Sequence, residues 1–123
     1  MARSVTIRVF QDAVEALADD PSDDISDVLD DLAEQVRVAA LANARKIVPS
    51  LPENFLTVEA GKDTKGIFFR VEPDGVGRLS SYLTWKEFRE HAWFEPALQE
   101  VIGGANLRTP GGRGARNFFN VFK

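Results

Sequence analysis

The residues best suited to chemistry lie in the segment EFREHAWFE, which contains the single histidine of the chain, His91. Glu87 precedes it by four positions, so on a helix the two side chains would lie on one face. A carboxylate beside an imidazole can exchange protons or bind a metal ion. The segment has no nucleophile, second histidine or HExxH spacing, and its pattern is more typical of a pair on a helix surface. The sequence therefore predicts no enzyme activity, metal site or cofactor.

Other segments that resemble ligand-binding motifs lack the spacing that those motifs require. The acidic run DDPSDDISDVLDD does not have the alternating ligands and central glycine of a calcium loop. The glycine-rich segments PDGVGRLSS and GGRGAR lack the GxxxxGK[ST] signature of a phosphate-binding loop. The chain has no cysteine, which excludes disulfides and thiolate metal sites. We interpret the acidic run as a solvated helix face and the glycine-rich segments as a turn and a flexible arm.

The composition fits one globular domain with uneven charge. A chain of 123 residues that is 44% hydrophobic can bury about two-thirds of the surface that its unfolded form exposes. No segment approaches the ~20 apolar residues of a membrane span, and MARSVTIRVF lacks the apolar region of a signal peptide. Within a net charge of −4, residues 1–34 hold ten acids and two bases, whereas the remainder holds nine acids and thirteen bases. We expect a soluble protein with two oppositely charged ends, which is either made and kept in the cytoplasm or packed into a particle.

Hydrophobic periodicity predicts an α+β fold, in which a mostly antiparallel sheet packs on one long helix. Residues 4–10 alternate like a strand, and residues 11–20 form a short helix or an irregular connection. Ser22 is the expected N-cap of the long helix, which the prolines at 49 and 52 end. Its inward stripe is Ile25, Leu29, Leu32 and Val36, and its outward acids are Asp23, Asp27, Asp30 and Asp31.

The second half of the chain predicts a hairpin followed by a shorter pair of helices. Residues 54–60 and 66–73 are rich in β-forming residues and are separated by a turn segment. A short strand is possible at residues 81–83, and Thr84 with Glu87 matches a capping box that would start a helix near Trp85. A second helix, FEPALQEVI, should end at Gly103 and Gly104. The expected aromatic core is Phe55, Phe68 or Phe69, Trp85, Phe88, and Trp93 or Phe94, with Ala92 also turned inward.

The C-terminal segment is basic, rich in glycine and ends with aromatic residues. We predict one domain over residues 1–104 and an extended C-terminal arm over residues 105–123. The arm either returns as an edge strand of its own sheet or docks on another chain. In the docking case arginines steer it and phenylalanines anchor it on the acidic start of a neighbour's long helix. The predicted subunit interface is Arg108, Arg113, Arg116, Phe118, Phe119 and Phe122 with Asp23, Asp27 and Asp30.

The alternative function for this segment is nucleic-acid binding. Arginine, glycine and phenylalanine together could combine phosphate contacts with base stacking. The overall acidity of the chain and the presence of only four basic residues in the segment argue against it. A nucleic-acid-binding accessory protein is therefore the alternative hypothesis, and direct contact with nucleic acid is not expected.

Two motifs resemble the small neck and tail-completion proteins of long-tailed bacteriophages. Members of that family have a long early helix ending in AP or VP, a β-sheet and a late helix like PFLRPAL. Here the long helix ends in NARKIVP, residues 43–49, and the late element is AWFEPALQEV, residues 92–101. The family's Asp-Thr-Gly-x-Leu-x-x-Ser motif is replaced after the first proline by SLPENF, and a related DGVGRLSS follows the predicted hairpin.

The resemblance implies a non-enzymatic structural protein of the virion, assembled in the host cytoplasm. Such proteins form oligomeric rings, often sixfold, at the head–tail junction or the tail end. The implied partners are other copies of the chain and other connector or tail proteins. Tail terminator, head–tail joining protein and minor capsid component remain open as specific roles.

Overall fold

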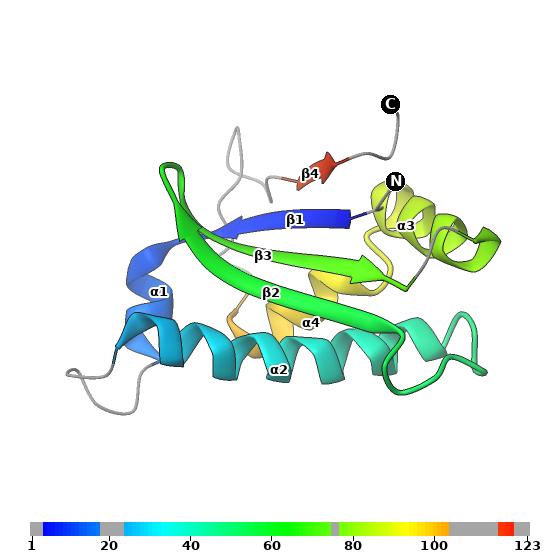
Figure 1. Cartoon of the computed structure of the whole chain (residues 1–123), viewed down its shortest axis with the longest axis horizontal. Helices are drawn as coiled ribbons and strands as arrows, with labels where there is room; N and C mark the ends of the chain where they lie inside the picture. The colour runs from blue at the N-terminus through cyan, green and yellow to red at the C-terminus, as the bar shows by residue number, and fades with distance from the viewer. Residues whose placement is uncertain (1–3, 18–23, 75–76, 104–115, 120–123) are drawn as a thin grey trace.

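A four-stranded antiparallel sheet lies over a long helix in the computed structural model, which describes residues 4–17, 24–74, 77–103 and the main chain of 116–119 (Figure 1). The strands are β1 (Ser4–Val9), β2 (Leu56–Asp63), β3 (Gly66–Pro73) and β4 (Arg116–Phe119), in the order β2-β3-β1-β4. The helices are α1 (Gln11–Ala16), α2 (Ile25–Arg45), α3 (Arg78–Glu90) and α4 (Phe94–Val101). The predicted α+β fold, with an antiparallel sheet on one long helix and a shorter helix pair, is confirmed.

The core lies between the sheet, α2 and α4. Val5, Ile7 and Val9 alternate along β1 and are fully buried, which confirms the predicted strand. Ile7 lies opposite Phe69 of β3, and that ring is also fully buried. The α2 helix packs against β2 on one side and α4 on the other. Each of these elements therefore has one face that is removed from water.

The predicted hairpin is confirmed and has a two-residue turn. Asp63 pairs with Gly66, and Gly66 has a positive φ of 114° that a residue with a side chain would adopt only with strain. The Asp63 carboxylate accepts a hydrogen bond of 2.8 Å from the Lys65 backbone N–H across the turn. It also accepts two hydrogen bonds of 2.8 Å from the Arg8 guanidinium on β1. One acid thus joins the tip of the hairpin to the neighbouring strand.

The α2 helix has the predicted buried stripe but a different N-cap. Leu29, Leu32 and Val36 are buried, and Ile25 packs against the core while partly exposed. The capping residue is Asp24 rather than Ser22, because the helix begins at Ile25 and the Asp24 carboxylate accepts from the backbone N–H of residue 26 at 2.9 Å. Ser22 itself lies outside the described residues.

The α3 helix corrects several predictions. It starts at Arg78, so neither a strand at residues 81–83 nor a helix start near Trp85 is correct. Thr84 does not cap this helix, because it lies in its interior, where its hydroxyl donates to the Ser80 carbonyl at 2.8 Å. Trp85 and Phe88 are exposed rather than inward. The remaining predicted core aromatics, Phe55, Phe68, Phe69, Trp93 and Phe94, are all buried, and Ala92 is partly buried.

The α4 helix follows the prediction from its proline and glycine residues. Pro96 lies in its first turn, and Gly103 follows it with a φ of 102°. Trp93, just before α4, is fully buried, and its indole N–H donates to the Leu83 carbonyl at 2.8 Å. This hydrogen bond ties the start of α4 to the middle of α3.

The C-terminal segment contributes β4 to the edge of the sheet. Main-chain residues 116–119 pair antiparallel with β1, with Val5 opposite Phe118. Of the two arrangements considered for the predicted arm, this strand therefore matches an edge strand of the chain's own sheet. Arg108, Arg113 and Phe122 lie outside the described residues, and the division of the chain at residue 104 stays a prediction.

Candidate protein-binding surface

Among the described residues, the predicted interface residues lie on two elements, α2 and β4. Asp27 and Asp30 are exposed on α2, which contacts β2 at one edge of the sheet. Arg116 belongs to β4 at the opposite edge, and Asp23 lies outside the described residues. The predicted contact between these acids and the basic segment stays a prediction, because most of that segment lies outside the described residues.

Glu87 and His91 do not form the expected surface pair. The α3 helix ends at Glu90, and His91 adopts a left-handed conformation with a φ of 52°. The exposed imidazole instead lies beside the next helix, with Nδ1 3.1 Å from a carboxylate oxygen of Glu95. Glu87 is fully buried. The two side chains have separate environments because the chain turns sharply between α3 and α4.

The Glu87 carboxylate caps α4. Its Oε1 accepts hydrogen bonds from the backbone N–H groups of Trp93 at 2.9 Å and Phe94 at 2.8 Å, and its Oε2 accepts from Glu95 at 3.2 Å. These N–H groups belong to the first turn of α4 and have no partner inside that helix. A negative charge at this position also interacts favourably with the helix dipole. Glu87 therefore fixes the orientation of α3 relative to α4.

The solvent-facing side of α3 carries large apolar side chains, which we call the aromatic face. The exposed fractions are 37% for Leu79, 43% for Tyr82, 46% for Trp85 and 38% for Phe88. The opposite side of the same helix buries Ser80, Leu83, Thr84 and Glu87. This distribution is inverted with respect to an ordinary surface helix, which places its apolar residues toward the core. Large exposed apolar patches on folded proteins are often sites of contact with another molecule.

Cationic side chains border the aromatic face. Lys86 lies 5.9 Å from the ring centre of Tyr82, and the Arg89 guanidinium lies 5.9 Å from that of Trp85. A hydrogen bond from Lys86 to Glu90 raises the pKa of the lysine, which is therefore charged at neutral pH. Arg78, at the start of α3, is exposed as well. The aromatic face is thus an apolar surface with a positive border.

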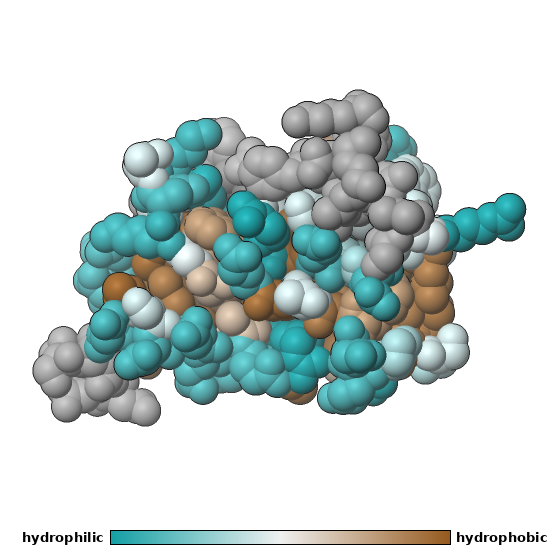
Figure 2. All heavy atoms as spheres, in the orientation of Figure 1, coloured by the Kyte–Doolittle hydropathy of each residue, from teal (hydrophilic) through white to brown (hydrophobic). Residues whose placement is uncertain are grey.

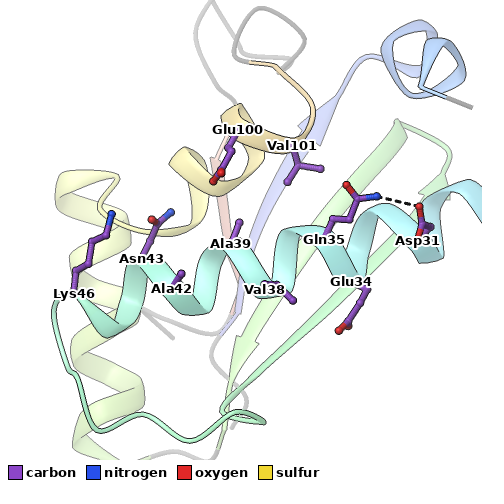
Figure 3. Close-up of a pocket in the computed structure, with 10 residues that line it drawn as sticks. All are labelled: Asp31, Glu34, Gln35, Val38, Ala39, Ala42, Asn43, Lys46, Glu100 and Val101. Atoms are coloured by element: carbon purple, nitrogen blue, oxygen red, sulfur yellow. Dashed lines mark hydrogen bonds between the residues drawn. The ribbon is translucent and has the colours of Figure 1, made fainter.

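A second surface, the α2–α4 groove, is hollowed between those two helices. It has a volume of about 750 Å³, within the range of about 300–1,000 Å³ typical of pockets that bind ligands. Ala39, Ala42 and Val38 line it from α2, and Val101 lines it from α4 (Figure 3). Val38 is 53% exposed, although it is β-branched and apolar. The groove therefore presents uncovered apolar surface over small side chains.

The charged residues of the α2–α4 groove are mostly acidic. Asp31, Glu34 and Glu100 line it, with Lys46 as the basic residue among its lining. Asp31 accepts a hydrogen bond of 3.0 Å from Gln35 on the next turn (Figure 3). The hydrogen bonds from Arg37 lower the pKa of Glu34, which is therefore ionised at neutral pH. Figure 2 shows hydrophilic side chains gathered along α2.

Within residues 4–17, 24–74 and 77–103, no group of three or more histidine, cysteine, aspartate or glutamate side chains is placed to hold a metal ion. No helix in the described part of the chain is long and apolar enough to cross a membrane. The described residues do present two exposed apolar surfaces, the aromatic face and the α2–α4 groove.

The aromatic face and the capping role of Glu87 were both missed from the sequence. The signal was present, because Leu79, Tyr82, Trp85 and Phe88 recur at intervals of three on a helix that begins at Arg78. The predicted helix began near Trp85, so Leu79 and Tyr82 fell outside it, and Trp85 and Phe88 were expected in the core. Comparisons of the chain with protein-family models, curated proteins and solved structures found no match.

Proposed function

We propose that the chain is a non-enzymatic structural subunit of a bacteriophage virion that forms an oligomeric ring at the head–tail junction or tail end. Its partners in the ring are other copies of the chain, and its further partners are other connector or tail proteins. The single observation that carries this proposal is the aromatic face of α3, which exposes four large apolar side chains and buries polar ones.

The aromatic face is large enough to contribute substantially to an interface. Large side chains of this kind bury about 150–250 Å² each when fully covered, so four that are roughly 40% exposed leave about 300 Å² uncovered. At about 25 cal/mol per Å², covering this area would contribute about 7.5 kcal/mol before the costs of association. A patch of this size is in the range that is often functional on folded proteins.

Two further features support an assembly role. The α2 helix ends at Arg45 within NARKIVP, and α4 lies within AWFEPALQEV, so the two segments that carry the resemblance to neck and tail-completion proteins each include part of a helix. The exposed acids in the first half of α2 and the cations on α3 also give one molecule surfaces of opposite charge. Complementary charges of this kind favour self-association in a fixed orientation.

The test is the mass of the purified protein over a concentration series, measured by light scattering and sedimentation without nucleic acid. We expect a discrete oligomer, with ring-shaped particles in negative-stain electron micrographs. His91→Gln is the matched control, because His91 is exposed beside α3 and we expect this variant to assemble as the wild type does. A monomer at every concentration, together with binding to nucleic acid, would instead support the accessory-protein alternative.

A further inference from the structure

The two surfaces of the chain differ in form. The aromatic face of α3 projects large side chains, and the α2–α4 groove is hollowed over Ala39 and Ala42. Small residues on a helix allow another helix to approach closely, so that larger side chains fill the space between them. Among the described residues both surfaces are exposed, one carrying large apolar side chains and the other hollowed over small ones.

The two surfaces complement each other in charge. Arg78, Lys86 and Arg89 border the aromatic face, with Glu90 already paired to Lys86 at 2.8 Å. The groove carries three acids and one base in its lining, and one of the acids, Glu34, is already paired to Arg37 at 2.7 Å. Placing the aromatic face in the groove would bring cations beside acids, whereas pairing two aromatic faces would bring like charges together. The charges therefore favour contact between different surfaces on two molecules.

We propose that the aromatic face of α3 in one copy of the chain docks in the α2–α4 groove of the next copy. This inference rests on the proposed function and deepens it, because it names the contact through which the ring would form. Such a contact joins two different surfaces, so every subunit offers one of each to its neighbours. A repeated head-to-tail contact closes into a ring when its rotation permits.

The proposal predicts the behaviour of two variants that each disable one surface. Trp85→Glu places an acid on the aromatic face and leaves the groove intact, whereas Ala42→Trp fills the groove and leaves the face intact. Both positions are exposed, so we expect the thermal melts of the two variants to match that of the wild type. Each variant alone should associate at least about tenfold more weakly than the wild type, because an interface of this kind depends on a few central residues.

Mixing the two variants tests whether the surfaces bind each other. The intact face of Ala42→Trp can still enter the intact groove of Trp85→Glu. The two surfaces that remain in this pair are both disabled, so no further subunit can add to it. We therefore expect a 1:1 mixture to form a heterodimer and to stop there, as measured by light scattering and native mass spectrometry. Tyr82→Glu and Val38→Trp replace the first pair if either variant fails to fold.

The outcomes separate this contact from the proposed function. If the wild type forms an oligomer but Ala42→Trp assembles equally well, assembly uses another surface and the docking proposal is wrong, while the proposed function stands. Variants that fail alone and also fail as a mixture would show that the two surfaces do not bind each other. A wild type that stays monomeric overturns the proposed function and the docking contact together.

Discussion

Replacing Glu87 tests how much one buried carboxylate contributes to the fold. Its oxygens accept from three backbone N–H groups at 2.9, 2.8 and 3.2 Å, all at the start of α4. Hydrogen bonds to a charged group are worth about 1.5–3 kcal/mol each, and a buried N–H left without a partner costs about 1–3 kcal/mol. Because such contributions are not additive, we expect Glu87→Ala to lower the free energy of unfolding by about 3–6 kcal/mol.

The assay is a thermal melt followed by circular dichroism. For a domain of this size, 1 kcal/mol corresponds to roughly 4 °C, so the melting temperature of Glu87→Ala should fall by roughly 12–24 °C. Glu87→Gln should cost less, because its amide oxygen can still accept from Trp93 and Phe94. Glu90→Gln is the control: this exposed carboxylate pairs only with Lys86 in the described contacts, and its loss should cost about 0.5 kcal/mol or less. If Glu87→Ala melted within about 2 °C of the control, the capping argument would be refuted.

Three further predictions concern the core, the hairpin and the sheet edge. Leu32→Ala should lower the free energy of unfolding by about 2–5 kcal/mol because the side chain is buried, whereas Asp30→Asn, at an exposed position, should barely change the melting temperature. The reverse ranking would refute the assignment of the buried and exposed faces of α2. The hydrogen bonds from Arg8, with that of the Lys65 backbone, lower the pKa of Asp63 from 3.8 to about 2. Because the pKa of Asp63 is lower in the folded state, its carboxylate stabilises the fold above pH 3.8, and this stabilisation is lost as the pH falls toward about 2. The wild type should therefore melt at a higher temperature than Asp63→Asn at neutral pH, and the two melting temperatures should converge over that interval. Deleting residues 106–123 removes β4, and the loss of its backbone hydrogen bonds should cost about 2–4 kcal/mol while leaving a folded domain; an unchanged melt would contradict the pairing of β4 with β1.

The elements that depend on local patterns could be predicted from the sequence. Alternation alone identifies β1, and the apolar stripe of α2 appears at helical spacing over 21 residues. The α4 helix is bounded by Pro96 and Gly103, whose backbone preferences act at those positions whatever the tertiary structure. In each case the information that determines the element lies within the element itself.

The errors fall where the determining contact lies outside the element. Thr84 and Glu87 have the spacing of a capping box, but the helix begins six residues before Thr84 and Glu87 caps the next helix. The N–H groups that Glu87 binds come after the chain reverses direction at His91, which has a left-handed conformation. Histidine adopts this conformation more often than most residues, but nothing else in the sequence indicates it at this position. The aromatic face was missed for a related reason, because large apolar residues were assigned to the core by type.

The burial of Glu87 and the exposure of the aromatic face have one cause. Turning α3 by half a turn would bury Tyr82, Trp85 and Phe88, which the hydrophobic effect favours. The same rotation would move the Glu87 carboxylate away from α4, and the backbone N–H groups at the start of α4 would lose that acceptor. The indole N–H of Trp93 would also lose its hydrogen bond to the Leu83 carbonyl. The polar contacts thus hold α3 in the orientation that presents its aromatic residues to solvent.

It follows that Glu87→Gln should weaken self-association at temperatures well below the melting temperature of the variant, since a small loss of capping frees α3 to turn these residues inward. Sedimentation of this variant at a temperature where circular dichroism shows it fully folded measures that effect, and assembly equal to the wild type's would show that the orientation of α3 does not depend on the carboxylate.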